Sequence, residues 1–328
     1  MLSMEFEDKK IFVAGASGLA GTSIIQHILG NCPSARIRGT YLSTRPFLKD
    51  ERIEFVQADL RHKEDCRLAM RGCDLAVMAA ANTAGARAAH DQPQLQMTDN
   101  LVMDANLLEA CYAENVPRVI FISSASVYQE FEGHIKEKQL DWNQDPHPAY
   151  FGVGWVKRAI EKLCQFWHDK FGQEIVVLRA ANIYGPYAKF DPGQSNFIPA
   201  LIRKAVERMD PFEVWGNPHV TRDVIFAPDF ARAVCLFLAK ENIKFDIYNL
   251  GTGKAVTVGD VAVKVLKSAG HAPRKIIYAD NEPTTIQFRA LDCGKMKDAI
   301  GWTPATSLAE GLQITTKWWI KNRSWWKK

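Results

Sequence analysis

The sequence has little of what marks a membrane-spanning, nucleic-acid-binding or secreted protein. No uninterrupted apolar run approaches the roughly 20 residues that a membrane-spanning helix needs. Basic and acidic residues nearly balance, at 41 against 37 for a formal net charge of +4, which gives no reason to expect nucleic acid but suits an anionic ligand. The opening stretch MLSMEFEDKK has no positive segment followed by an apolar one, so no secretory signal is expected.

Cysteine and histidine form no pattern typical of disulfides or metals. The seven cysteines are scattered, odd in number and never form a CxxC pair, and the eight histidines show no metal-ligand spacing. We therefore expect neither a disulfide framework nor a metal site, and we expect a cytoplasmic protein in a reducing compartment. Most of the cysteines should be small buried apolar residues.

The composition is that of a globular protein, with 47% apolar and 24% charged residues over 328 positions. In the first half, short β-rich runs alternate with helical stretches, which predicts an α/β fold built on a doubly wound, parallel, Rossmann-type sheet. Strands are expected at residues 10–14, 35–41, 53–57, 74–79, 116–123 and 175–179, and helices at 18–29, 100–114 and 156–171.

The alternation breaks after about residue 180, where Gly, Pro, Asn and Asp become frequent. We therefore expect residues 1–180 to form a dinucleotide-binding domain, with later return segments near 223–253. Residues 181–328 should then form mainly a smaller C-terminal substrate-binding lobe. The basic, aromatic end of the chain around Trp318 and Trp319 is typical of a last helix that packs on its own domain; contact with a membrane surface or a partner is the alternative.

A glycine-rich segment lies where the first strand turns into the first helix. Glycines there allow a tight turn, close approach of the backbone to a pyrophosphate, and helix–strand packing, while the helix N-terminus supplies N–H groups to the phosphates. The strand–turn–helix context predicts a dinucleotide site. The expected cofactor contacts in this segment are Gly15, Ser17, Gly18, Leu19 and Gly21.

The end of the second strand decides between the two nicotinamide dinucleotides. A carboxylate there would accept a hydrogen bond from the ribose 2′-OH and repel a 2′-phosphate, and none is present. Ser43 and Thr44 can donate hydrogen bonds and Arg45 can pair with a phosphate, so the segment favours NADP (NADPH) over NAD. The alternative is that Arg45 is only an exposed loop residue.

The spacing GxxGxxG resembles that of the short-chain dehydrogenase/reductase superfamily, and motifs further along resemble its extended branch, which works on nucleotide sugars. Within that branch, the pattern is most similar to the GDP-L-fucose synthase family, over about residues 10 to 320. The matching motifs are Ser123-Ser124-Ala125-Ser126-Val127-Tyr128, Asn182-Ile183-Tyr184-Gly185-Pro186, Phe197-Ile198-Pro199-Ala200-Leu201, Trp215-Gly216 with Arg222-Asp223, and Asn249-Leu250-Gly251-Thr252-Gly253. The resemblance implies that Asp59 and Leu60 cup the adenine, that Ala79 and Ala80 pass under the nicotinamide ribose, and that the protein is a homodimer.

For the chemistry, the resemblance implies a Ser that holds the carbonyl, here Ser124, and a Lys that grips the nicotinamide ribose, here Lys157. The family's Tyr, four residues before the Lys, is replaced by Val153. Three alternatives follow. Tyr150 serves as a substitute acid if the helix already runs through it; the proton comes from Ser124, Ser126, water or the sugar; or the site binds without reacting.

Two further positions depart from the resembled family. Asn196 stands where the family has an epimerising His, and Ser126 stands where it has a Cys. Since an amide cannot exchange a proton near neutral pH and a serine is a far weaker acid than a cysteine, double epimerisation is not expected. The substrate contacts that the resemblance implies are Asn182, Asn196, Lys204, Trp215, Arg222 and Arg289.

These observations predict an NADP-dependent enzyme that modifies a nucleotide-linked keto-sugar, by reduction of a GDP-4-keto-6-deoxy-type sugar in carbohydrate biosynthesis. One alternative is a redox-neutral nucleotide-sugar epimerase or dehydratase that retains its cofactor. The other is a non-catalytic nucleotide-binding homologue, which Val153 and Asn196 would suit.

Overall fold

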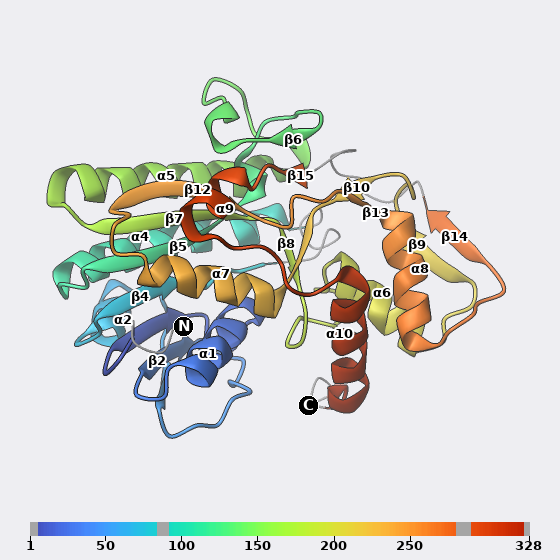
Figure 1. Cartoon of the computed structure of the whole chain (residues 1–328), viewed down its shortest axis with the longest axis horizontal. Coiled ribbons are helices and arrows are strands. Elements are labelled where there is room, and N and C mark those ends of the chain that lie inside the picture. Colours follow the sequence, from blue (N-terminus) through green and yellow to red (C-terminus); the bar gives the residue numbers. More distant parts are fainter. Residues whose placement is uncertain (1–5, 84–91, 280–289, 325–328) are drawn as a thin grey trace.

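The computed structural model describes residues 6–83, 92–279 and 290–324, and it centres on a seven-stranded parallel sheet (Figure 1). The strand order β12-β7-β5-β4-β1-β2-β3 reverses direction between β1 and β4, as in a doubly wound fold, so the predicted fold class is confirmed. The strands are β1 (Lys10–Ala14), β2 (Arg36–Tyr41), β3 (Ile53–Gln57), β4 (Leu75–Met78), β5 (Arg118–Ser124), β7 (Glu174–Ala180) and β12 (Phe245–Leu250).

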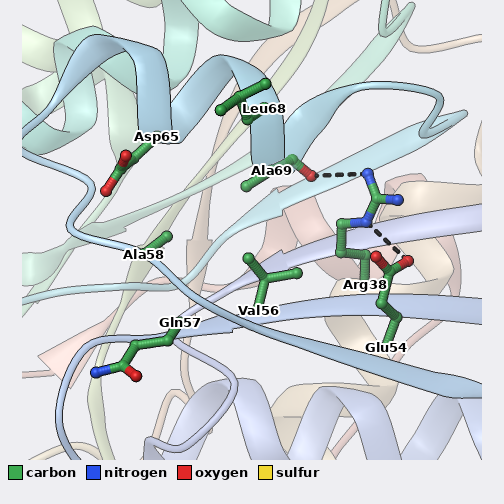
Figure 2. A pocket seen from close by; sticks show the side chains of 8 residues that line it. All are labelled: Arg38, Glu54, Val56, Gln57, Ala58, Asp65, Leu68 and Ala69. Carbon is green, nitrogen blue, oxygen red and sulfur yellow. Dashed lines mark hydrogen bonds and ion pairs between the residues drawn. The ribbon is translucent and has the colours of Figure 1, made fainter.

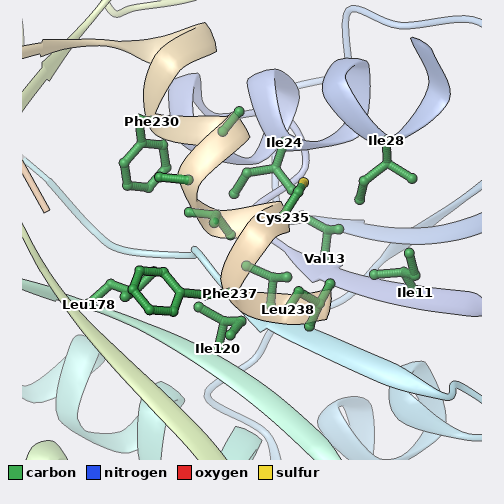
Figure 3. Packing of buried hydrophobic residues seen from close by; sticks show 14 of the residues in the cluster. Ile11, Val13, Ile24, Ile28, Ile120, Leu178, Phe230, Cys235, Phe237 and Leu238 are labelled. Atoms are coloured by element: carbon green, nitrogen blue, oxygen red, sulfur yellow. The ribbon is translucent and has the colours of Figure 1, made fainter. Parts of the chain in front are cut away.

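Helices cover both faces of this sheet because alternate strand residues are apolar on both sides. Ile11 and Val13 of β1 lie in one core cluster with α1 (Leu19–Asn31) and α7 (Ala227–Ala239), which Figure 3 shows. Phe12 of the same strand lies in the opposite cluster. That second cluster contains buried residues of α2 (Lys63–Met70), α4 (Thr98–Ala113) and α5 (Phe151–Phe171). Strands buried on both faces explain why the sequence shows continuous apolar runs.

The helix predicted at 156–171 begins earlier than the sequence pattern indicated. A 3₁₀ turn, Pro148–Tyr150, leads directly into α5, which starts at Phe151. Glycines at 152 and 154 made this stretch read as loop, because glycine is a poor helix former. Gly154 is required here, since a Cβ at that position would lie 2.5 Å from the carbonyl oxygen of Ser126.

The C-terminal part of the chain adds small sheets and a group of helices beside the central sheet (Figure 1). The helices α6 (Phe197–Val206), α8 (Val258–Ala269) and α10 (Leu308–Asn322) share one core cluster. β12 nonetheless joins the central sheet beside β7. The remaining elements are β6 (His134–Ile135), β8 (Asn182–Tyr184), β9 (Phe212–Trp215), β10 (Thr221–Arg222), β11 (Val224–Phe226), β13 (Val256–Thr257), β14 (Ile276–Ala279), β15 (Ala290–Leu291) and α9 (Gly294–Ile300). The division into two lobes at residue 180 stays a prediction.

The cysteines behave as the composition indicated. Six are buried, Cys293 is half-buried, and all are free thiols. Among the described residues, no helix is long and apolar enough to cross a membrane. The same residues contain no group of three or more His, Cys, Asp or Glu side chains placed to hold a metal ion.

Candidate cofactor and substrate site

The glycine-rich segment forms a tight turn between β1 and α1. Gly15 has a φ of 75°, in the left-handed region, and a Cβ at Gly21 would lie 2.2 Å from the carbonyl oxygen of Gly15. Gly18 is the N-cap residue of α1 but has no side chain with which to cap it, and the first turn of the helix holds no acidic residue. The N–H groups and positive dipole of this helix end therefore suit a pyrophosphate. Ser17 and Leu19 are half-buried beside them.

The end of β4 passes beside this turn. A Cβ at Gly15 would lie 2.7 Å from the Cα of Ala80, so only glycine permits the approach. Ala79 and Ala80 follow the last residue of β4 and are half-buried. The two loops that flank the reversal of strand order thus meet, which is where open α/β sheets bind nucleotides.

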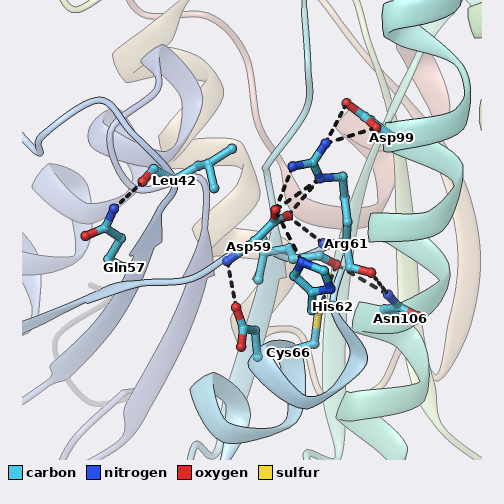
Figure 4. A network of polar contacts seen from close by, with 10 residues as sticks. Leu42, Gln57, Asp59, Arg61, His62, Cys66, Asp99 and Asn106 are labelled. Atoms are coloured by element: carbon cyan, nitrogen blue, oxygen red, sulfur yellow. Dashed lines mark hydrogen bonds and ion pairs between the residues drawn. The ribbon is translucent and has the colours of Figure 1, made fainter.

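The loop after β2 presents the residues expected to choose between cofactors. Ser43, Thr44 and Arg45 are exposed, and within residues 6–83, 92–279 and 290–324 no carboxylate pairs with Arg45. The loop's base is fixed by Gln57, whose side-chain amide donates to the carbonyl oxygen of Leu42 at 2.9 Å (Figure 4).

The carboxylate of Asp59 is already engaged by a neighbour that the sequence analysis did not single out. Arg61 donates to both of its oxygens, the shortest contact being 2.6 Å, and the side-chain hydrogen bond from Arg61 lowers the pKa of Asp59 to about 2 (Figure 4). Arg61 also approaches Asp99 at 3.4 Å. Leu60 is buried, and its carbonyl oxygen accepts from the thiol of Cys66. An adenine bound here would share Asp59 with Arg61.

Ser124, predicted to hold the carbonyl, ends β5, and Ser126 lies in the 3₁₀ turn that follows it, Ala125–Val127. The Oγ of Ser124 accepts a hydrogen bond from the backbone N–H of Ser126 at 3.1 Å. Ser126 is 4% exposed, and its own Oγ has no hydrogen-bond partner within the described part of the chain. Since buried hydroxyls are nearly always paired, this oxygen is placed to meet a ligand or water.

Lys157 is buried and forms an ion pair that sequence reasoning missed. Its Nζ lies 2.9 Å from Oδ2 of Asp104 on α4 and 4.6 Å from the ring centroid of Phe121. Burial raises the pKa of Asp104, and the charge of Lys157 opposes that rise. The available sequence signal was an acidic residue, Asp104, among apolar residues in the helix expected at 100–114. The role of Lys157 toward a nicotinamide ribose stays a prediction.

Tyr150 does not lie on the helix that carries Lys157. It is the N-cap residue of α5, with φ −124° and ψ 14°, and its backbone N–H closes the preceding 3₁₀ turn on His147. The condition under which it would share a helical face with Lys157 is therefore not met. Val153, in the first turn of α5, is half-buried and offers no proton.

A buried polar network behind the serines excludes another tyrosine as the acid. The Tyr128 hydroxyl donates to Asn249 at 2.6 Å and accepts from Arg179 at 3.0 Å, and burial raises its pKa. Arg179 pairs with Glu161 at 2.7 Å, and Glu161 accepts from the Ser123 hydroxyl. This network joins α5 to β5, β7 and β12 and fixes the strand ends around the site.

The predicted substrate residues fall into separate groups. Lys204 donates to the carbonyl oxygen of Glu213 at 3.0 Å and lies 5.1 Å from the Trp215 ring centroid. Trp215 in turn donates from Nε1 to Oε1 of Glu213 at 2.7 Å, so Lys204 and Trp215 form one cluster.

The other predicted substrate residues lie on different elements. The backbone N–H of Asn182 donates to the carbonyl oxygen of Asp223, next to Arg222, which places the exposed Asn182 beside β10. Asn196 is exposed at the N-terminus of α6, and Arg289 lies outside the described residues.

Asp223 itself is a structural residue. Its carboxylate accepts from the Thr252 hydroxyl at 2.7 Å and from the backbone N–H of Gly253 at 3.0 Å. A Cβ at Gly251 would lie 2.5 Å from the same carboxylate, so Asp223 fixes the turn after β12.

One pocket in the structure lies between α2 and the ends of β2 and β3, next to Asp59, whose backbone N–H donates to the lining residue Asp65 at 2.9 Å. Arg38, Glu54 and residues of α2 line it, and none of its lining residues belongs to the predicted site (Figure 2). Arg38 spans it, donating to Glu54 at 2.9 Å and to the carbonyl oxygen of Ala69 at 3.3 Å. These contacts identify it as a gap between α2 and the sheet edge that an ion pair closes.

The chain is similar to known proteins over most of its length. The model of the NAD dependent epimerase/dehydratase family matches residues 11–251. GDP-mannose 3,5-epimerase of Arabidopsis thaliana is 29% identical over 97% of this chain and 83% of its own length. GDP-L-fucose synthase of Sinorhizobium fredii is 27% identical over 96% of this chain and 97% of its own. The crystal structure of UDP-glucuronic acid 4-epimerase from Bacillus cereus, in complex with UDP-glucuronic acid and NAD, is 25% identical with a TM-score of 0.83, covering 95% of this chain and 99% of that one.

Proposed function

Since the chain belongs to the NAD dependent epimerase/dehydratase family, we propose that it is a nucleotide-sugar-modifying enzyme that reduces a GDP-4-keto-6-deoxy-type sugar with NADP as its cofactor. Relatives that cover nearly the whole chain are named as GDP-sugar enzymes, which supports the substrate class. The cytoplasm is the proposed location.

The observation that carries the proposal is the set of groups at the carboxyl ends of adjacent strands. The glycine turn follows β1, Ala79 and Ala80 follow β4, Ser124 ends β5, and Asn182 follows β7. These strands are neighbours in the order β7-β5-β4-β1. Parallel strands present their carboxyl ends at one edge, so the groups that we expect to bind phosphate and sugar come together there.

The residues present fit a nicotinamide dinucleotide. The open N-terminus of α1 would hold the pyrophosphate, Arg45 would pair with the 2′-phosphate, Asp59 and Leu60 would contact the adenine, and Lys157 would orient the nicotinamide ribose. The cofactor, when bound, supplies a hydride to a carbonyl carbon.

At the other side of the reacting carbonyl, Ser124 would hold the oxygen and Ser126 would relay a proton to it from water. The Ser126 hydroxyl suits this role because it is buried and has no hydrogen-bond partner in the described part of the chain. Tyr128 keeps its proton, because both its acceptor and its donor are used inside the protein.

A redox-neutral epimerase is the second candidate, because two of the relatives compared above are named epimerases. Against double epimerisation stand Ser126 and the amide of Asn196, neither of which is a good proton donor to carbon.

Mixing the purified protein, NADPH and GDP-4-keto-6-deoxymannose separates these candidates. We expect NADPH absorbance to fall in step with consumption of the keto-sugar. Conversion of the sugar at constant NADPH would replace reduction by the redox-neutral reaction. A sugar left unchanged while NADPH is bound would contradict the proposed activity.

We also propose that the protein is a homodimer that associates through α4 and α5. These two helices pack side by side, and their outer face exposes the aromatic side chains of Tyr112, Phe166 and Phe171, which contact one another and the half-buried Trp167. Phe166 and Phe171 are each 46% exposed and Tyr112 is 44% exposed. A contiguous apolar patch of this kind is typical of an association surface.

A further inference from the structure

The loop that carries Arg45 is anchored on both sides of its exposed tip. Past the tip, Phe47 and Leu48 turn inward and are half-buried. At the far end, Arg52 pairs with Asp50 at 2.8 Å and donates to the carbonyl oxygen of Leu29 at 3.1 Å, at the end of α1. Phe47 lies two residues after Arg45, between the exposed tip and that anchor.

Phe47 packs into a group of three aromatic rings from distant parts of the chain. Its ring centroid lies 4.9 Å from that of Tyr187 and 5.9 Å from that of Trp318 on α10. Tyr187 and Trp318 are themselves 4.9 Å apart, and all three pairs meet edge to face. The next residue of α10, Trp319, stacks its ring on Phe190 with the ring centroids 4.2 Å apart, which fixes the helix.

Tyr187 is held in an unusual conformation by contacts with the dinucleotide-binding half. Its φ is 69°, in the left-handed region that residues with a Cβ rarely adopt. Its hydroxyl accepts from the side-chain amide of Gln26 on α1 at 2.9 Å. Two positions later, Lys189 donates to the carbonyl oxygen of Thr83, beyond β4, at 3.0 Å. Strained residues persist where the surroundings over-determine them, and they cluster at functional sites.

Through Trp318, α10 makes contacts with Phe47 and Tyr187 in addition to its packing in the C-terminal core. Trp318 is only half-buried, and it contacts both the C-terminal core and the loop that carries Arg45. Because an ordered loop loses less freedom when its ligand binds, a ring that holds Phe47 improves the affinity for whatever Arg45 contacts. The benefit falls on the group that Arg45 pairs with, which is absent from NADH.

We propose that Tyr187 and Trp318 are positioning residues that hold the Arg45 loop, through Phe47, in the shape that binds the 2′-phosphate of NADP. This inference rests on the proposed use of NADP. It makes the C-terminal helix a determinant of cofactor choice.

The test measures dissociation constants for NADPH and NADH by calorimetry, without any sugar substrate. We expect Trp318→Ala to weaken NADPH about tenfold, which corresponds to about 1.4 kcal/mol, and to change NADH by less than about twofold. Phe47→Ala should give the same selective loss. The double variant should lose no more than either single one, because both remove the same contact. Ile320→Ala is the matched control, because the Ile320 side chain on α10 is 48% exposed. This variant should bind both nucleotides as the wild type does.

Three results would overturn the inference. Wild-type protein that binds NADH as tightly as NADPH would remove the NADP assignment and this role together. If the ratio of the NADH to the NADPH dissociation constant in a folded Trp318→Ala or Phe47→Ala protein equals that of a wild type that prefers NADPH, and both affinities are unchanged, this role alone is removed. Equal losses for both nucleotides would reduce the aromatic group to general support of the fold. If Trp318→Ala does not fold, Phe47→Ala decides the question from the loop's side.

Discussion

Ser126 combines a buried hydroxyl with the position expected to face the substrate. An unpaired buried hydroxyl costs free energy of folding, so Ser126→Ala should raise the free energy of unfolding by about 1 kcal/mol. If the hydroxyl relays the proton, turnover should fall about 100-fold while NADPH affinity stays unchanged. Urea unfolding and steady-state kinetics measure the two effects.

Ser34→Ala is the control for that prediction, because its hydroxyl is exposed and accepts from the backbone N–H of Asp8. It should leave both turnover and stability close to wild type. A Ser126→Ala protein with full turnover would remove Ser126 from the mechanism, and a loss of stability would mean that water satisfies the hydroxyl.

Asp59 and Arg61 should contribute to stability in a defined pH range. The Arg61 hydrogen bond lowers the pKa of Asp59 in the folded state to about 2, below its value of about 3.9 in an unfolded chain. The stabilisation is therefore fully present above about pH 4 and is lost as the pH falls toward about 2. Thermal unfolding between these limits should show a steeper loss for the wild type than for Arg61→Gln. Parallel curves would contradict the pairing.

Sequence reasoning missed Asp104, whose partner Lys157 comes from another element, and Arg61, whose partner Asp59 is a near neighbour. The glycine turn could be predicted because strand, turn and helix are consecutive. Asp104 lies far from Lys157 in sequence, and their pairing depends on α4 packing against α5. Local pattern does not contain that information. Arg61 is a near neighbour of Asp59, but many exposed arginines make no such contact.

At the scale of elements, Gly154 in α5 is a position where helix propensity predicts the wrong effect of a substitution on stability. Helix propensity alone predicts that Gly154→Ala would stabilise the protein by about 1 kcal/mol. The new Cβ would instead meet the Ser126 carbonyl oxygen and the Pro146 Cβ, both at 2.5 Å. We expect destabilisation by about 1–3 kcal/mol because the helix must move away from the serine turn.

Gly30 in α1 is the matched control for this substitution. A Cβ there would meet nothing within 4 Å, so Gly30→Ala should follow propensity and stabilise by about 0.5–1 kcal/mol. Denaturant midpoints of the two variants measure the difference. Stabilisation by both would show that α5 and the serine turn separate without cost.

The central strands could be predicted from sequence, whereas the short pairs could not. A strand buried on both faces gives a continuous apolar run of four or more residues. The pairs β10·β13 and β6·β15 have two residues on each strand, too few to show any periodicity. They form because the turns after β12 and around Asp223 bring their backbones together.

At the scale of the whole molecule, the strand order does most to place the site. It reverses between β1 and β4, so the glycine turn and the alanines after β4 meet at one edge. Alternation of strands and helices predicts the doubly wound sheet. It does not show which strand or helix the later segments near 223–253 pack against. That α7 packs against α1, and β12 against β7, follows from tertiary burial of their apolar faces.

The exposed aromatic cluster of α4 and α5 gives the last prediction, which concerns association. A stable interface must bury far more apolar area than isolated surface residues provide, and Tyr112, Phe166, Trp167 and Phe171 already form a contiguous patch. Light scattering during gel filtration should give the wild type twice the mass of one chain. Phe166→Glu should give one chain mass, because a carboxylate at the centre of an apolar interface loses its hydration without a partner.

Val263→Glu on α8 is the control for this change. Val263 is 56% exposed but lies outside the cluster, so its variant should remain a dimer. A monomeric wild type would contradict the proposed dimer. A dimeric Phe166→Glu protein would move the interface away from these helices. Since the cofactor turn follows β1, on another part of the sheet, the monomeric variant should still bind NADPH with wild-type affinity. A loss of binding with the loss of the dimer would mean that the partner subunit supports the site.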